Sequence, residues 1–287
     1  MPLDARMVGE STRTFTHDVD ARWLMAYAAG LGDLNPAYLD TQAGTVIAHP
    51  VFPVCLEWPV ILSSHELAGY ETVTRAESAR GVHASHDLHL YRPIRAGERL
   101  TTRATIISLM AIRPGAAQMT RLDTTDASGA LVCRTYQLGI SRDVAVTGGS
   151  SSVEAAPDTP GPVTPDASAP VLSLAVAGGA AHTYTECARI WNPIHTDRAV
   201  ALAAGLPDII LHGTATMALS VSALVNACLD GDPTRVRRLG GRFAAMVLMP
   251  STLTVHVQSI ADGVIRYQVL TEDGQPAFQN AFLCFDG

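Results

Sequence analysis

Lysine is missing from this sequence, because all 20 basic residues among its 287 positions are arginine. Catalysis through a lysine Schiff base is therefore excluded, as is a phosphate-binding loop that depends on its lysine. The formal net charge of −7 argues against a nucleic-acid partner, whose phosphates require a basic surface. Charged residues make up only 16% of the chain and hydrophobic residues 47%, a balance typical of a compact globular protein.

Cysteine is also scarce, and its five positions are scattered along the chain: Cys55, Cys133, Cys187, Cys228 and Cys284. The number is odd and no pair has the C-x-x-C spacing. Neither a disulfide framework nor a zinc site is indicated.

Histidines at positions 83, 86 and 89 invite comparison with a metal site. In a strand, however, His83 and His89 would share one face while His86 would point to the other. Three ligands on one metal need a common face. We therefore expect no metal and no other cofactor.

Long hydrophobic runs are absent as well. No apolar stretch approaches the length that spans a bilayer, and the first residues, MPLDARMVGESTRTF, contain no apolar signal core. These features predict a cytoplasmic protein without a membrane partner.

One stretch lacks almost all large apolar side chains. Residues 147–170, TGGSSSVEAAPDTPGPVTPDASAP, cannot bury enough apolar surface to form a core. This composition predicts a flexible linker between an N-terminal part, residues 1–146, and a C-terminal part, residues 171–287.

The two parts repeat one pattern. DLNPAYLD at residues 33–40 aligns with IWNPIHTD at residues 190–197, and VIAHP at 46–50 aligns with IILHG at 209–213. An apolar segment follows each time, and the one at 214–229 is long enough for a helix buried on nearly all sides.

Strand-like segments follow each apolar segment: 83–94, 98–110 and 117–140 in the first part, and 242–248, 251–260, 265–271 and 277–285 in the second. The sequence EDGQ at 272–275 predicts a tight hairpin turn. This order predicts an α+β fold in which each repeat wraps an antiparallel sheet around one buried helix.

These motifs resemble the MaoC-like (R)-specific enoyl-CoA hydratase / 3-hydroxyacyl-thioester dehydratase family, here as a tandem double hotdog. The second repeat supplies Asn192, Pro193, His195 and Asp197, followed by His212-Gly213. The first repeat supplies Asp33 and Asn35 but has Tyr38 where the family has histidine, so its site is degenerate.

The resemblance implies reversible hydration of 2-enoyl thioesters, or dehydration of 3-hydroxyacyl thioesters, with the acyl group on CoA or a carrier protein. It implies that His195 is the catalytic base and that Asn192 orients it or a water molecule. His212, Gly213 and Thr214 would bind the substrate, with a backbone N–H holding the thioester oxygen at the start of a helix. A homodimer is compatible with this pattern.

The sequence departs from the family at one position that matters for the chemistry. Five residues before His195, where the family has aspartate, stands Ile190. Glu186 is the candidate for a substitute carboxylate. Two other possibilities stay open: a one-base isomerase or eliminase on the same scaffold, or a non-catalytic subunit that binds acyl thioesters or another protein.

The acidic residues of the two repeat motifs have structural interpretations too. Thr196 or Asp197 is expected to cap a helix that ends near Gly205, and Asp40 is expected to do the same in the first repeat. Asp33 is expected to fix its own loop through backbone hydrogen bonds, without completing the His195 site.

Overall fold

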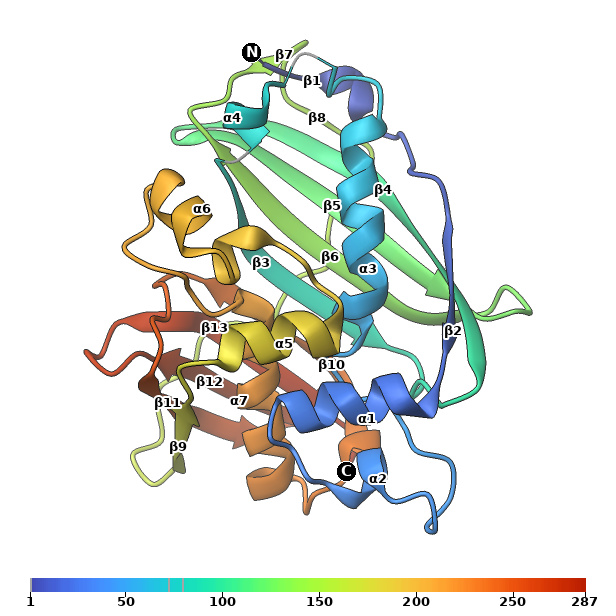
Figure 1. Cartoon of the computed structure of the whole chain (residues 1–287), viewed down its shortest axis with the longest axis vertical. Coiled ribbons are helices and arrows are strands. Elements are labelled where there is room, and N and C mark those ends of the chain that lie inside the picture. Colours follow the sequence, from blue (N-terminus) through green and yellow to red (C-terminus); the bar gives the residue numbers. More distant parts are fainter. Residues whose placement is uncertain (1, 72, 79) are drawn as a thin grey trace. The chain divides into compact units, whose positions relative to one another are not determined.

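The computed structural model describes residues 2–71, 73–78 and 80–287 (Figure 1). The described residues divide into two compact units. The first unit draws on residues 1–17, 56–89 and 99–159, and the second on residues 18–55, 90–98 and 160–287. The units therefore do not coincide with the two sequence repeats, because the start of the first repeat folds with the whole of the second.

The first unit is built on a sheet with the strand order β2-β4-β5-β6-β3, in which β8 also pairs with β4. Its longer strands are β2 (Phe15–Val19), β3 (Gly81–Leu90), β4 (Glu98–Ile112), β5 (Gly115–Thr125) and β6 (Leu131–Arg142). The short strands β1 (Leu3–Asp4) and β7 (Val146–Thr147) form a parallel pair, and β8 is Ser151–Ser152. The short helical turns are η1 (Ala5–Met7), η2 (Ser64–Glu66) and α4 (Arg75–Ser78).

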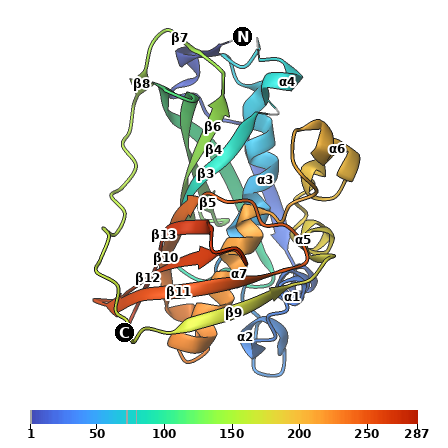
Figure 2. The same cartoon turned by 90° about the vertical axis from the view of Figure 1, so that its left-hand side faces the viewer.

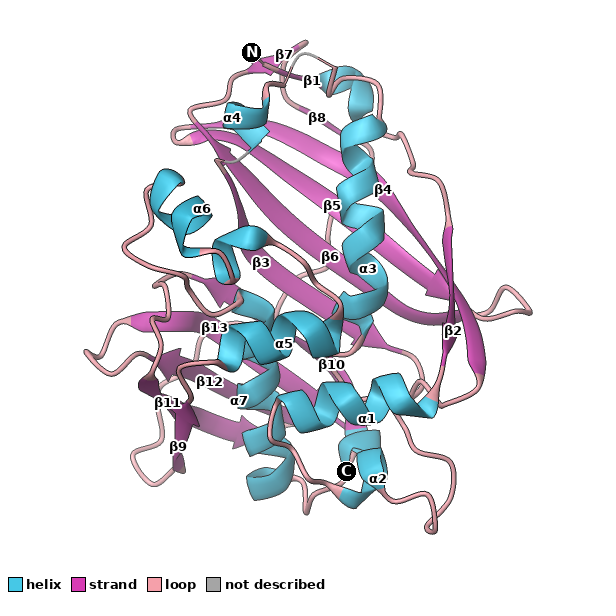
Figure 3. Cartoon of the chain, in the orientation of Figure 1, coloured by secondary structure: helices cyan, strands magenta, loops and turns pink. Residues whose placement is uncertain are grey.

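Helix α3 (Pro53–Ser63) lies along this sheet, as Figure 3 shows. Val60 is fully buried against Ala104 of β4 and Leu122 of β5. Apolar residues cover most of the circumference of α3, so burial of the helix against the sheet removes them from water.

The second unit has its own antiparallel sheet with the order β10-β13-β12-β11-β9. Its strands are β9 (Val171–Val176), β10 (Val236–Phe243), β11 (Ser251–Ala261), β12 (Val264–Leu270) and β13 (Pro276–Phe285). Helix α7 (Gly213–Cys228) contacts β13 and β9 and lies on one face of this sheet (Figure 2). The smaller elements of the unit are α1 (Ala21–Gly30), α2 (Pro36–Leu39), α5 (Ala180–Ala188), η3 (Pro193–His195), α6 (Arg198–Ala203) and η4 (Pro233–Arg235).

Helices α1 and α5, one from each repeat, cross in close contact within the second unit. A methyl group on Gly30 would lie 2.8 Å from Cβ of Cys187, so only glycine permits this approach. Tyr27 and Tyr184 meet across the contact with hydroxyl oxygens 3.3 Å apart. They are 157 residues apart, the same spacing that separates Asn35 from Asn192. The crossing is therefore a point of approximate symmetry between the repeats.

The structure confirms several local predictions. Helix α7 covers the predicted buried segment, and Asp197 caps α6 by accepting hydrogen bonds from the N–H groups of Ala199 and Val200. The turn at 272–275 joins β12 to β13, as expected. The strand expected at 242–248 instead occupies Val236–Phe243, where Gly240 and Gly241 had obscured its start.

Two further local predictions are wrong. Asp40 ends the short helix α2 and accepts a hydrogen bond from the N–H of Gln42, because no helix follows it. The rings of His83 and His86 do not point to opposite faces, since their centroids are 5.3 Å apart. The alternation of β3 breaks there: three consecutive residues, 86–88, are buried.

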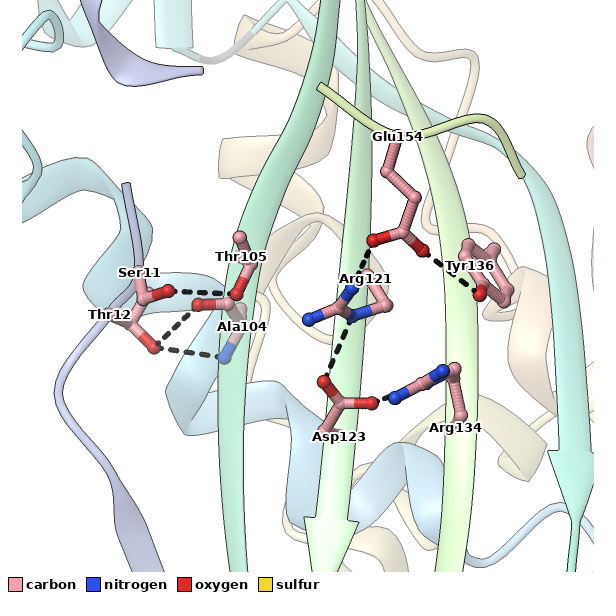
Figure 4. Close-up of polar contacts among 9 residues, drawn as sticks. All are labelled: Ser11, Thr12, Ala104, Thr105, Arg121, Asp123, Arg134, Tyr136 and Glu154. Carbon is pink, nitrogen blue, oxygen red and sulfur yellow. Dashed lines mark hydrogen bonds and ion pairs between the residues drawn. The ribbon is translucent and has the colours of Figure 1, made fainter. Parts of the chain in front are cut away.

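The segment between the repeats is tethered where it leaves the first unit. Glu154 pairs with Arg121 of β5 and accepts a hydrogen bond from the Tyr136 hydroxyl at 3.2 Å (Figure 4). Asp123 lies between Arg121 and Arg134 in the same cluster. The first residues of the 147–170 segment are thus held to the sheet.

Candidate functional site

The start of α7 presents backbone N–H groups without helical partners. His212 occupies the cap position, and its carbonyl accepts hydrogen bonds from the N–H groups of Ala215 and Thr216. The N–H groups of Gly213 and Thr214 precede any intrahelical bond, and they lie at the positive end of the helix dipole. An oxygen that gains negative charge during a reaction would be stabilised here.

His195 lies in η3 and is almost completely buried, with 9% of its surface exposed. Its Nδ1 is 2.8 Å from the carbonyl oxygen of Ile210. A carbonyl oxygen only accepts, so Nδ1 carries the hydrogen and Nε2 carries the lone pair. Burial lowers the pKa of His195 to about 4, and the ring is therefore neutral near pH 7.

His212 stacks against His195, with ring centroids 3.7 Å apart and planes inclined by 26°. Burial and the neighbouring His195 both lower the pKa of His212 far below its usual value. The Nε2 of His212 is 3.2 Å from the hydroxyl of Thr185 on α5. This contact holds the ring that in turn supports His195.

Two tyrosines extend the cluster towards α1. The Tyr184 hydroxyl donates to Oγ1 of Thr214 at 3.1 Å, and Tyr27 lies beyond it. Burial raises the pKa of Tyr184 well above its usual value, so it stays protonated. Sequence reasoning missed Tyr27, Tyr184 and Thr185, although the 157-residue spacing of the tyrosines was a signal that could have revealed two of them.

Gly213 has a packing role that its sequence motif did not reveal. A Cβ at this position would lie 2.9 Å from Cδ1 of Phe243, whose ring stacks on Phe278. The glycine lets the Phe243 ring approach the first turn of α7. Because Gly213 has no side chain, its backbone stays uncovered while the Phe243 ring packs closely against it.

The other predicted site residues lie around this cluster in different ways. The Asn192 carbonyl accepts the N–H of His195 at 3.1 Å, which fixes the turn that carries the histidine. Ile190 is 5% exposed at the position where the family has aspartate. Glu186 lies on an exposed face of α5, next to the inward-facing Thr185. The structure thus brings His195, His212, Gly213 and Thr214 together and leaves Glu186 at the surface.

The first repeat has a counterpart of this cluster. Tyr38 corresponds to His195, and its ring centroid lies 5.5 Å from that of His49, the counterpart of His212. His49 lies 5.7 Å from Tyr27, so a row of rings runs through the second unit from one repeat site to the other. The two sites also differ at Asp33, which stands where the second repeat has Ile190.

Residues 2–71, 73–78 and 80–287 contain no group of three or more His, Cys, Asp or Glu side chains arranged to hold a metal ion. None of their helices has the length and apolar character needed to cross a membrane.

Comparison with known families gives two matches. The MaoC-like domain matches residues 169–277, and the dehydratase domain region of the FAS1-like type matches residues 6–135. Together the matched segments span both repeats. This chain belongs to the MaoC-like dehydratase family.

Individual proteins agree with the assignment to the MaoC-like family. Enoyl-CoA hydratase ChsH3 of Mycobacterium tuberculosis is 47% identical over 66 residues, 23% of each chain. A MaoC-like dehydratase from Phytophthora capsici superposes with a TM-score of 0.83 at 20% identity, over 97% of this chain and 95% of the other. The M. tuberculosis protein RV0216, described as a double hotdog, gives a TM-score of 0.60 at 17% identity, over 96% and 95%.

These likenesses confirm the predicted fold. The chain is an α+β protein with the double hotdog fold. The matched segments cover less than a quarter of the length of the first two curated relatives, ChsH3 and a peroxisomal enoyl-CoA hydratase 2 of Arabidopsis thaliana. In this chain the motif is divided, with the histidine, His195, in the second repeat and the aspartate, Asp33, in the first.

Proposed function

We propose that this chain catalyses the reversible addition of water to 2-enoyl thioesters, with His195 as the general base. The observation that carries the proposal is the hydrogen bond from His195 Nδ1 to the Ile210 carbonyl at 2.8 Å. It fixes the tautomer in which Nε2 has a free lone pair beside the start of α7. The motif of the MaoC-like family supports the same assignment.

In the hydration direction, Nε2 of His195 takes a proton from water as the water oxygen bonds to C3 of the enoyl group. Negative charge develops on the thioester oxygen, where the N–H groups of Gly213 and Thr214 stabilise it. The resulting imidazolium then returns a proton to C2. In the reverse direction the base removes the proton from C2, and the hydroxyl at C3 leaves with a proton.

The second proton carrier is the unusual part of this proposal. Ile190 offers no carboxylate, and Glu186 is exposed on α5. We propose that protonated His195 or a water molecule supplies the leaving hydroxyl with its proton. Glu186 contributes only if substrate binding moves its side chain into the site. Asn192 keeps its proposed role of orienting His195, here through its backbone carbonyl.

The decisive experiment measures hydration of short and long 2-enoyl-CoA thioesters. His195→Ala and His195→Gln should each reduce kcat by about 10²- to 10⁴-fold, the usual contribution of a general base. Glu186→Gln should change kcat less than twofold. Activity of His195→Gln equal to that of the unmodified protein would remove this residue from the mechanism. Assays with acyl-pantetheine and acyl-carrier-protein substrates would identify the carrier, and sedimentation would test the homodimer.

A second candidate is a one-base reaction such as isomerisation of the enoyl double bond. The buried, apolar Ile190 beside the histidine pair favours it, because isomerisation moves one proton and needs no leaving-group acid. Exchange of C2 hydrogen with deuterium from the solvent, without net hydration, would support it. Thermal stabilisation by acyl-CoA without any turnover would instead favour a binding subunit.

A further inference from the structure

Strand β9 forms one end of the sheet in the second unit (Figure 2). Within the residues that the structure describes, β9 pairs with β11 alone, in a register that runs from Ser251↔Val176 to His256↔Val171. An antiparallel edge strand directs half of its backbone N–H and C=O groups away from its neighbour. These groups form a template on which a further strand can pair.

The sequence of β9 lacks the features that commonly prevent such pairing. Val171–Val176 reads VLSLAV, without a charge, a proline or a glycine. Its register with β11 is continuous, so no bulge turns the edge aside. Natural edge strands that face water usually carry charged side chains, proline or a bulge. The composition of β9 therefore indicates an edge that another strand covers.

The corresponding strand of the first repeat is different. Strand β2 precedes α1 as β9 precedes α5, and it forms the edge of the sheet in the first unit. Its sequence, FTHDV, contains His17 and Asp18, and Arg13 comes shortly before it. Charges on an edge oppose pairing with a second copy of the same strand. Of these two equivalent edges, one carries charge and the other does not.

The charge distribution favours a second copy of this chain as the strand that covers β9. The chain has a formal net charge of −7, yet no Asp, Glu or Arg occurs between positions 167 and 185. Two copies therefore repel each other least where their β9 edges meet. A partner strand must itself be uncharged and apolar on one face, and β9 meets this requirement.

The pattern of β9 also fits a copy of itself. Its exposed residues are Val171, Ser173 and Ala175, and its more buried residues are Leu172, Leu174 and Val176. A two-fold axis through Ser173, perpendicular to the sheet, pairs two β9 strands antiparallel and keeps each face on the same side. Leu172 then lies opposite Leu174 of the second copy, and this apolar pair occurs twice about the axis.

The more buried face of β9 adjoins further apolar surface. Leu174 lines a groove of about 430 Å³ together with Leu219 of α7 and Leu34 of the loop after α1. Leu34 is 74% exposed. A second sheet that continues from β9 would lie beside this groove, and removal of its apolar lining from water would favour association.

We propose that β9 is a dimer interface, at which two copies of this chain pair antiparallel about a two-fold axis at Ser173. The sheets of the two second units then continue into each other. No residue of the His195 cluster lies on β9, so the interface is separate from the proposed catalytic site.

Sedimentation velocity of the full chain, from about 1 to 100 µM, tests this proposal, and a dimer should form within that range. Ser173→Glu places two carboxylates opposite each other at the axis, so the dissociation constant should rise at least about tenfold. Ser173→Lys should weaken the dimer in the same way. An equimolar mixture of the two variants should restore it, because opposite charges then face each other.

Ala261→Glu is the matched control. Ala261 is an exposed residue at the far end of β11, beyond the stretch that pairs with β9, and the substitution adds the same charge. This variant should dimerise like the unmodified protein.

Three results would each overturn the proposal: an unmodified chain that stays monomeric at about 100 µM, a dimer that Ser173→Glu leaves intact, or variants that associate no better together than apart. Thermal melts verify folding, and substitutions of opposite charge keep the test valid if one variant does not fold. The readout is mass rather than turnover. Failure of the interface is thus distinguishable from failure of the proposed hydratase activity.

Discussion

The imidazole ring of His195 lies on the ring of His212, with centroids 3.7 Å apart. Two protonated rings at this distance would repel each other, and burial disfavours the charge on either one. The neutral state of the pair is therefore the stable one near pH 7. His212 supports His195 by stacking, while the Ile210 carbonyl sets its tautomer.

The acid limb of the pH–activity profile should reflect this buried pair. The proposed base must be neutral, and burial lowers the pKa of His195 from 6.5 to about 4. Activity should therefore persist below pH 6 and decline near pH 4. Measurement of kcat/KM for enoyl-CoA hydration between pH 3.5 and 8 checks this, and an acid limb with a midpoint near 6.5 would contradict it.

Stability should change with pH through the same residue. The unfolded chain binds a proton at His195 near pH 6.5, whereas the folded chain does so near pH 4. The contribution of the neutral ring is complete above pH 6.5 and is lost as the pH falls to 4, by about 1.4 kcal/mol per pH unit. The free energy of unfolding of His195→Gln, measured with urea, should therefore change less with pH than that of the unmodified protein. The difference between pH 4 and 6.5 should be about 1.4 kcal/mol per pH unit.

Much of this architecture could be predicted because the repeats carry local signals. The Thr196-Asp197 capping pattern predicted the start of α6, and the apolar run after Gly213 predicted α7. The partners of the histidines could not be predicted in this way. Thr185 contacts His212 only because α5 packs against the loop before α7, and such a tertiary contact leaves no periodic trace in the sequence. The contact between the His83 and His86 rings likewise depends on a break in the alternation of buried and exposed residues along β3.

Gly213→Ala should separate the packing role of this glycine from its role at the substrate. The new methyl group would meet the ring of Phe243 at 2.9 Å and should destabilise the fold by about 1–3 kcal/mol. Phe243→Leu in the same chain should recover much of that loss in urea unfolding. If activity returns together with stability, the glycine serves packing alone. Recovered stability without activity is our expected result, because the methyl group would still crowd the thioester oxygen.

Glu57 should make the first unit less stable at alkaline pH. This carboxyl group is 1% exposed on α3 and accepts a hydrogen bond from the Thr135 hydroxyl. Burial raises its pKa from 4.5 to about 7, despite that hydrogen bond. Its stabilising contribution is complete below pH 4.5 and is lost as the pH rises through 7.

Glu57→Gln should therefore stabilise the protein at pH 8, by on the order of 3 kcal/mol. The amide oxygen can still accept from Thr135, so the local contact survives. Glu10→Gln, at an exposed glutamate of the same unit, is the control and should have little effect. Unfolding free energies at pH 5 and pH 8 check the prediction, and a stabilisation of equal size at both would contradict it.

Ile190→Asp should test whether the missing carboxylate limits the reaction. The new side chain would stand where the family has aspartate, five residues before His195 in the second repeat. If protonation of the leaving hydroxyl is slow, an acid here should raise kcat for 3-hydroxyacyl dehydration by about tenfold or more. The buried position, 5% exposed in the native protein, should at the same time lower the melting temperature. Ile190→Asn is the matched control, because it has a similar size and polarity without an acid, and it should lose stability without gaining activity. Equal rates in the two variants would mean that His195 and water already supply every proton the reaction needs.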